Sequence, residues 1–142
     1  MRPEATVPLG HWLYVSRCMV APAWAANTVD ALVAQAVARN AQLALTGALL
    51  FTGSHFVQAL EGPEPALAMM RATICRDPRH AGIRTLDEGT LAQRRFADWS
   101  LAYAGGSAYL AAQVQQAINL ADRVPTLVRL LQAFAFPAPR PA

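Results

Sequence analysis

The chain has 142 residues and a mass of 15.2 kDa, which suits one domain, because a single hydrophobic core usually spans roughly 100 to 200 residues. Hydrophobic residues make up 54% and charged residues 15%, but polar residues interrupt every apolar run before the ~18 residues that a membrane-spanning helix needs. The first ten residues lack the apolar segment of about 7 to 15 residues that marks a secretory signal. These features argue against membrane and secreted proteins, so we expect a cytoplasmic domain without a membrane partner.

The net charge is +3, and all 12 cationic residues are arginines. They are spread along the chain, and only Arg94 and Arg95 are adjacent, whereas a protein that follows a nucleic-acid backbone concentrates its cations on one stripe. The two cysteines, Cys18 and Cys75, form neither a CxxC motif nor a cluster with histidine. We therefore expect no nucleic-acid partner and no metal site, and we expect both thiols to be reduced.

The first half of the chain predicts a strand, a helix and a hairpin. Residues 11–17 (HWLYVSR) form a β-rich run that places even-numbered side chains on one face and odd-numbered ones on the other. Asn27 is a suitable N-cap for a helix with apolar residues at helical spacing, and we expect this helix to end near Asn40. The apolar runs 45–51 and 55–61 are separated by Thr-Gly-Ser, which is typical of a β-hairpin.

The second half predicts a helix, two strands and two further helices. Pro63 and Pro65 begin a helix that Asp77 ends, and residues 82–88 and 96–103 alternate as strands do. The resulting order, βαββαββ, indicates an α+β fold: a ferredoxin-like mixed sheet with an added strand and two helices on one face. Residues 107–121 and 125–134 form two amphipathic helices that we expect on the other face, and the Pro-rich end of the chain, 136–142, is predicted to be frayed.

One polar residue stands out among the apolar runs. Gln58 lies in the middle of residues 56–60, on the strand face that would point into the protein. Leaving its buried amide unpaired would cost about 1 to 3 kcal/mol, so a polar side chain or a ligand should lie beside it. Tyr14 and Asn40 are the candidate partners. No motif for an activated nucleophile, a zinc protease, a P-loop or a dinucleotide is present, so an enzyme is not expected.

Five segments in unbroken order resemble one family. They are LYVSR (13–17), RNAQLALTGALLF (39–51), HFVQALEGP (55–63), RDPRHAGIRTLDEG (76–89) and RRFADWSLAY (94–103), and together they resemble the BLUF family of blue-light sensors using FAD. The resemblance implies a non-covalently bound FAD whose ring slides between the two helices, edge toward the sheet. It also implies four parts of the chain: an N-terminal extension (1–10), a flavin-binding core (11–104), a C-terminal helical cap (105–135) and a Pro-rich tail (136–142).

The resemblance implies specific roles for individual residues. Tyr14 would be the electron and proton donor to the excited flavin, and Gln58 would bridge Tyr14 to flavin N5 and the C4 carbonyl. Asn40 would bind the pyrimidine edge of the ring. The remaining cofactor-binding residues that it implies are polar groups beside the flavin, Ser16, Asp77, Arg79 and His80, and apolar walls of the ring slot, Leu32, Phe56 and Ile74.

Each role has a plainer alternative on local sequence alone. Tyr14 could be a half-buried strand tyrosine. Asn40 could be a helix C-cap in left-handed geometry. Asp77, Arg79 and His80 could be ordinary helix-end and loop residues.

The sequence departs from the family pattern in what we expect to be the last strand. The family usually has Trp-Ser-Met there, and this chain has Trp99-Ser100-Leu101. Leucine nearly conserves the volume of methionine but removes the thioether sulfur, a weak hydrogen-bond acceptor near the expected position of Gln58. We expect the photochemistry to persist and the dark recovery or signal transmission to change. Trp99 and Leu101 are the candidate transmission residues.

The signal must act beyond the flavin site. The apolar positions of the C-terminal helices exceed what one sheet face needs, which favours a homo-oligomer, and short members of the family typically signal through a separate protein. Two other functional classes stay open: a light-independent protein-interaction module on the same fold, and a small flavin oxidoreductase.

Overall fold

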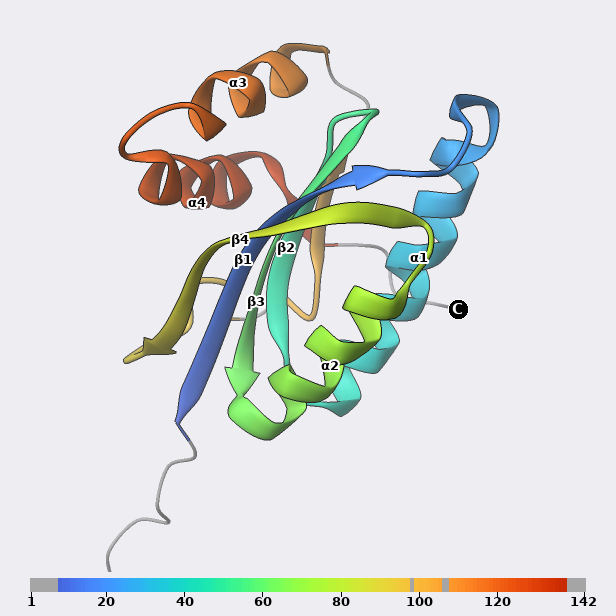
Figure 1. The fold of residues 1–142 in the computed structure, drawn as a ribbon. Coiled ribbons are helices and arrows are strands. Elements are labelled where there is room, and N and C mark those ends of the chain that lie inside the picture. Colours follow the sequence, from blue (N-terminus) through green and yellow to red (C-terminus); the bar gives the residue numbers. More distant parts are fainter. Residues whose placement is uncertain (1–7, 98, 106–107, 138–142) are drawn as a thin grey trace, which may run out of the picture.

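A computed structural model describes residues 8–97, 99–105 and 108–137 as a twisted sheet between two helical layers (Figure 1). The strands are β1 (Leu9–Cys18), β2 (Thr46–Phe51), β3 (His55–Pro63), β4 (His80–Leu91), β5 (Ala102–Gly105) and β6 (Phe136–Pro137). Their order across the sheet is β4-β1-β3-β2-β5-β6. The first four strands have the ferredoxin-like order and pair antiparallel, while β5 joins β2 in parallel, so the predicted α+β fold with an added strand is confirmed.

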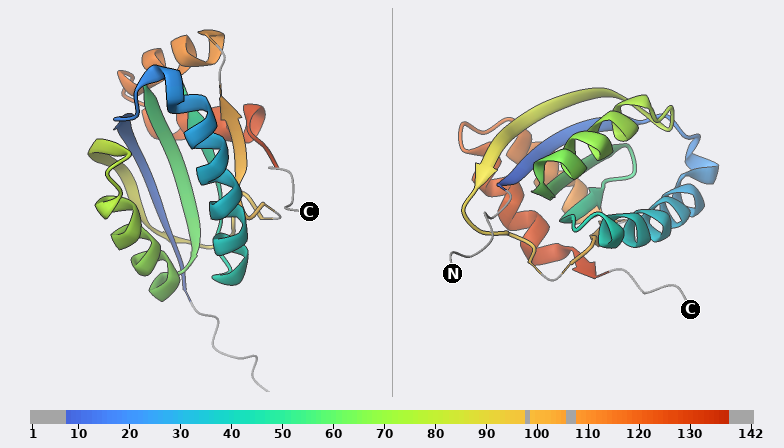
Figure 2. Two further views of the ribbon diagram at one scale, coloured as in Figure 1. Left: turned by 90° about the vertical axis from the view of Figure 1, so that its right-hand side faces the viewer. Right: turned by 90° about the horizontal axis from the view of Figure 1, so that it is seen from below.

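Two pairs of helices cover opposite faces of the sheet, as predicted. Helices α1 (Pro22–Gln42) and α2 (Glu64–Arg76) cover one side, here named the α1/α2 face, and α3 (Ala108–Ile118) and α4 (Arg123–Phe134) cover the other, the α3/α4 face (Figure 2). The period-2 alternation of the strands assigns each side chain to a face. Buried strand residues on the α3/α4 face include Leu13, Val15, Ala48, Leu50, Val57 and Ala59.

Helix α1 begins earlier than its best polar cap signal predicts. The expected N-cap, Asn27, lies inside the helix, which starts at Pro22 and has no side-chain cap. Pro22 has its φ angle already set for a first helical position, and the alanine-rich segment after it has high helix propensity, so the helix gains more than a turn.

The end of α1 corrects a second expectation. Asn40 is helical, so it is not a left-handed C-cap; the residue with positive φ is Ala44, at 57°. The amide of Leu45 donates to the carbonyl of Asn40 at 2.9 Å and that of Ala44 to Ala41 at 3.4 Å, which is the Schellman pattern. Ala44 thus occupies the position that usually favours glycine.

The β2–β3 hairpin was predicted correctly. Gly53 has φ +99° in the turn, a conformation that suits a residue without a side chain. Strand β4 is longer than the predicted 82–88, and it lies at the edge of the sheet beside β1. Strand β1 begins at Leu9, two residues before the start of the predicted flavin-binding core.

The strand predicted within residues 96–103 begins only at Ala102, as β5, and it continues to Gly105. The buried carboxylate of Glu61, at the end of β3, holds the preceding segment in a loop. It accepts the backbone N–H groups of Arg95 and Phe96, both at 2.8 Å, and the hydroxyl of Thr46 at 2.7 Å. The loop uses its backbone donors on this side chain, so it cannot use them in a strand ladder.

The C-terminal helices pack as amphipathic helices against the sheet. Leu110, Val114, Leu127 and Leu131 are buried, whereas Tyr109 is exposed. After α4, residues Phe136–Pro137 pair with β5, so this part of the tail is not frayed, and the rest of the Pro-rich segment lies outside the described residues. Among the helices that the structure describes, none is long and apolar enough to cross a membrane.

Candidate functional site

Tyr14 and Gln58 form a buried hydrogen-bonded pair at the centre of the α1/α2 face. They are direct partners in the β1–β3 register, and the phenol hydroxyl donates to Oε1 of the amide at 2.5 Å. Both side chains are buried, with 3% and 6% exposure. Burial, with smaller contributions from the negative charges of Cys75 and Asp77, raises the pKa of Tyr14 well above its usual value. The phenol is therefore a neutral donor at physiological pH.

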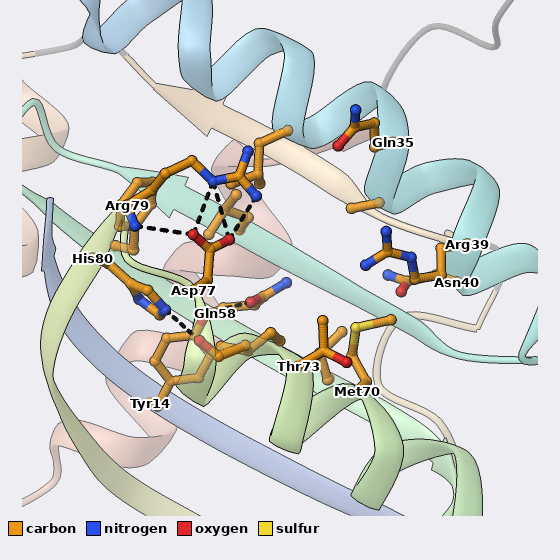
Figure 3. A pocket seen from close by; sticks show the side chains of 16 residues that line it. Tyr14, Gln35, Arg39, Asn40, Gln58, Met70, Thr73, Asp77, Arg79 and His80 are labelled. Atoms are coloured by element: carbon orange, nitrogen blue, oxygen red, sulfur yellow. Dashed lines mark hydrogen bonds and ion pairs between the residues drawn. The ribbon is translucent and has the colours of Figure 1, made fainter. Parts of the chain in front are cut away.

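A cavity of about 690 Å³, including its open mouth, lies in front of this pair, between α1 and α2 (Figure 3). Its lining combines apolar walls with a few polar groups, as small-molecule sites do. The amide nitrogen of Gln58 points away from Tyr14 into the cavity (Figure 3). The lining side chains are Tyr14, Leu32, Gln35, Ala36, Arg39, Asn40, Leu49, Phe56, Gln58, Leu60, Met70, Thr73, Ile74, Asp77, Arg79 and His80.

The α1 side of the cavity carries three polar side chains. Asn40 is only 1% exposed, and its Nδ2 donates to the carbonyl of Ser100 at 2.9 Å, which leaves Oδ1 as its remaining acceptor. Gln35 and Arg39 line the same wall (Figure 3). The sequence assigned a role to neither Gln35 nor Arg39. The signal was available, because Gln35 and Arg39 follow the predicted wall residue Leu32 by three and seven positions and so share its helix face.

An ion pair lies at the end of α2. Asp77 accepts the backbone N–H of Arg79 at 2.9 Å, and the Arg79 guanidinium binds both carboxylate oxygens, with Nη2 2.5 Å from Oδ2. Hydrogen bonding from Arg79 lowers the pKa of Asp77 and raises that of Arg79, although burial opposes both shifts. The arrangement presents one positive and one negative side chain together at the cavity wall.

His80 connects β1 to α2. Its Nε2 lies 2.7 Å from the carbonyl of Ile74, and its Nδ1 lies 2.7 Å from the hydroxyl of Ser16. A carbonyl only accepts, so Nε2 carries the proton, and in the neutral imidazole Nδ1 accepts from Ser16. His80, the first residue of β4, thereby links the last turn of α2 to Ser16 on β1.

The structure brings most of the predicted site residues together. Leu32 comes from α1, Phe56 from β3 and Ile74 from α2, and all three line the cavity. Met70 and Thr73, to which the sequence assigned no role, line it as well, at helical spacing from Ile74 and Asp77.

Three predicted residues lie outside the cavity lining. Ser16 lies behind His80, to which it is bonded. Trp99 and Leu101 precede β5 and do not lie in it. Their side chains pack on opposite faces of the sheet. Trp99 packs on the α3/α4 core and accepts the N–H of Gly47 at 3.0 Å, whereas Leu101 is buried in the core cluster of Phe56 on the α1/α2 face.

A sequence model described as BLUF, sensors of blue-light using FAD, matches residues 9–102, about two thirds of the chain. The chain belongs to the BLUF family. It is therefore a flavin-binding domain that senses blue light, and the resemblance found in the sequence is confirmed.

Relatives of known structure and function agree. The chain is 47% identical over 68 residues to the blue light- and temperature-regulated antirepressor BluF of Escherichia coli (strain K12), covering 48% of this chain and 17% of that protein. The structure matches dark-state BlrB, a BLUF protein, with a TM-score of 0.74 and 32% identity over 91% of this chain and 98% of that one. It matches Klebsiella pneumoniae BlrP1 with FMN and cyclic diGMP at a TM-score of 0.62 and 35% identity, over 68% of this chain and 26% of that one. The chain spans less than a fifth of the length of the curated relatives that it matches.

The residues of the cavity suit a flavin. The Gln58 amide nitrogen is a donor that faces the cavity, and the ring nitrogens and carbonyls of a flavin offer acceptors for it (Figure 3). Asn40 offers an acceptor to an N–H group, and Leu32 and Ile74 present apolar walls to the faces of a flat ring. Within the described residues, no group of three His, Cys, Asp or Glu side chains could hold a metal ion.

Proposed function

We propose that this BLUF domain holds FAD non-covalently in the cavity between α1 and α2 and signals by rearranging the hydrogen bonds of Tyr14 and Gln58. The observation that carries the proposal is the 2.5 Å hydrogen bond between these residues at the floor of the cavity. A bound flavin supplies a strong one-electron oxidant when it absorbs blue light.

Tyr14 and Gln58 are the photoactive residues in this account. Tyr14 loses an electron, which makes its hydroxyl proton acidic, and Oε1 of Gln58 is the acceptor already in place to receive that proton. The amide has one acceptor and two donor hydrogens, so rotation or tautomerisation of this one group reverses its hydrogen bonds without moving the strands. A stronger hydrogen bond from Gln58 to the C4 carbonyl of the flavin would shift its absorption to the red.

The other cavity residues bind and orient the ring. Oδ1 of Asn40 accepts from the pyrimidine edge while its Nδ2 stays on Ser100. The Asp77–Arg79 pair would lie near the ribityl chain of a bound flavin. Apolar walls come from Leu32, Phe56 and Ile74, with His80 beside them and Ser16 setting the orientation of His80.

Output passes through protein contacts, and the domain itself performs no turnover. Leu101 is buried near the photoactive strand while its near neighbour Trp99 contacts the α3/α4 core, so a shift of this segment would reach the C-terminal helical cap (105–135) from the flavin-binding core (11–104). A homo-oligomer formed through that cap, or a separate downstream protein, would receive the change. The antirepressor activity named for the BluF relative is consistent with a protein partner.

The test is to purify the protein in darkness, record its visible spectrum before and after a blue pulse, and identify the released cofactor by mass. We expect FAD and a reversible red shift. A colourless protein, even after reconstitution with FAD, would instead favour the light-independent interaction module. Steady consumption of a nicotinamide reductant would favour the oxidoreductase.

A further inference from the structure

Trp12 lies directly beside the photoactive tyrosine. The Trp12 and Tyr14 rings are stacked, with centroids 4.4 Å apart and planes inclined by 27°. Trp12 is 1% exposed, and its indole N–H donates to the hydroxyl of Thr85 at 2.9 Å. The stack is as close as aromatic pairs in proteins become, so an electron can pass between the two rings.

A positive charge is held over the same indole. The guanidinium carbon of Arg71, on α2, lies 4.7 Å from the centroid of the Trp12 ring. Arg71 is fixed there by Glu88, at 2.9 Å, and by the hydroxyl of Thr85, at 3.4 Å. Glu88 is itself the register partner of Trp12 on β4, so the sheet brings the carboxylate, the cation and the indole together.

The position of Arg71 over Trp12 affects which of the two stacked rings, Trp12 or Tyr14, stays oxidised after one electron is lost. The following inference rests on the proposed function, in which photoexcited flavin takes one electron from Tyr14. An indole gives up an electron about as readily as a phenol, so Trp12 is a competing donor in contact with the oxidised tyrosine. We propose that Arg71 confines the oxidation to Tyr14 by opposing the formation of a positive charge on Trp12.

The competing step moves one electron from Trp12 to Tyr14 and returns one proton to Tyr14. Trp12 loses one electron and becomes a radical cation, while Tyr14 gains that electron and takes back its proton at Oη from the amide of Gln58. The phenol is then restored, so the hydrogen-bond rearrangement is cancelled. The new positive charge on the buried indole would lie next to the guanidinium, and the two like charges would repel each other, although the 37% exposure of the Arg71 side chain weakens this repulsion.

Glu88 reduces this repulsion only in part. The Glu88 side chain is 56% exposed and that of Arg71 37%, so water screens the carboxylate more than the guanidinium, which lies over the buried indole ring. Arg71 does not line the cavity, and it acts through Trp12 alone. It is therefore a positioning residue for the charge, not a catalytic one.

The test uses the full chain loaded with flavin and compares variants of the two residues. Arg71→Met removes the charge but keeps the length of the side chain, Arg71→Lys keeps the charge, and Trp12→Phe removes the competing donor. Arg76→Met, an exposed arginine on the same helix, is the matched control. The readouts are the yield of the red-shifted form per absorbed photon and the electron paramagnetic resonance signal of a tryptophan radical trapped after a blue flash.

We expect Arg71→Met to lower the yield by about two-fold or more and to produce a tryptophan radical, because the electrostatic barrier is gone. Arg71→Lys and Arg76→Met should resemble the parent protein. The double variant Arg71→Met with Trp12→Phe should recover the yield and lose the radical signal.

Two results for the yield would overturn the inference. A low yield that persists in the double variant would show a merely structural role for Arg71, and an unchanged yield in Arg71→Met would show no role. A radical that persists without Trp12 would also overturn it. Failure of the parent protein to shift reversibly would instead contradict the proposed function, and the parent sample shows this before any variant is made.

Discussion

The Tyr14 hydroxyl donates to Oε1 of Gln58 across two neighbouring strands, at 2.5 Å and between residues directly opposite each other in the sheet. The geometry of this pair is set by the β1–β3 register and not by loops, although 44 positions separate the two residues along the chain. A change in the Gln58 amide must break or reverse this bond. Any such change therefore begins in two paired strands inside the sheet.

Replacing Leu101 with methionine should slow the dark recovery. The variant adds a thioether sulfur, a weak acceptor that a rearranged Gln58 amide can use, to the buried cluster on the α1/α2 face. We expect recovery about two-fold slower or more, which needs only ~0.4 kcal/mol of added barrier. Recovery is followed by absorbance after a blue pulse. Leu50→Met, on the opposite face, is the volume-matched control, and equal recovery rates and equal light-induced structural changes in Leu101→Met and the parent would contradict the expectation.

Much of the sheet could be predicted, because it depends on local periodicity, whereas most of the site residues were implied by the resemblance to the BLUF family. Alternation in residues 11–17 put Tyr14 on the inward face, and the amide of Gln58 inside an apolar run required a buried polar partner. The hairpin followed from its turn residues. These features arise from neighbours along the chain, which a sequence shows directly.

The features that escaped prediction depend on contacts distant in sequence or on competition between signals. The Glu61 carboxylate binds the backbone N–H groups of Arg95 and Phe96, which are 34 and 35 positions away in the sequence, and so holds them in a loop. The alternation pattern of residues 96–103 gives no sign of these hydrogen bonds. The proline and alanines after residue 21 outweighed the polar cap signal of Asn27. The left-handed position after α1 is filled by Ala44, a residue type that gives no turn signal.

Glu61→Gln should destabilise the fold. The carboxylate accepts three hydrogen bonds while almost fully buried, and an amide would set its NH₂ group against backbone donors. We expect a loss of about 2 to 3 kcal/mol in the free energy of unfolding, measured by urea denaturation. Glu88→Gln removes an exposed carboxylate and should cost about 1 kcal/mol or less. Similar losses in the two variants would show that the Glu61 carboxylate does not hold the loop.

Ala44→Gly should stabilise the protein. Ala44 has a φ of 57°, where the Cβ atom is strained and glycine is not. The expected gain in the free energy of unfolding is about 1 kcal/mol. As a control, Ala41→Gly inside α1 should lose about 0.5 to 1 kcal/mol. Thermal unfolding checks both, and a loss at both positions would rule out strain at Ala44.

The ion pair of Asp77 and Arg79 should make stability depend on pH in the acidic range. Arg79 holds the pKa of Asp77 below its usual value, so the folded state favours the carboxylate. This contribution is complete above the unfolded pKa of about 3.9 and is lost as the pH falls through the lower folded pKa. The parent should therefore be more stable than Asp77→Asn at pH 6, and the difference should shrink below about pH 4. Denaturation at both pH values checks this, and a constant difference would mean that the ion pair does not contribute.

The most direct test of the account is the light-minus-dark absorption spectrum of Tyr14→Phe, loaded with flavin and compared with the parent. Phenylalanine keeps the buried ring but removes the hydroxyl that donates to Gln58. Tyr109→Phe, an exposed tyrosine on α3, is the matched control. The account predicts a reversible red shift in the parent and in Tyr109→Phe, and none in Tyr14→Phe. A full red shift in flavin-loaded Tyr14→Phe would contradict it, because the switch would then work without the hydrogen bond on which it is built.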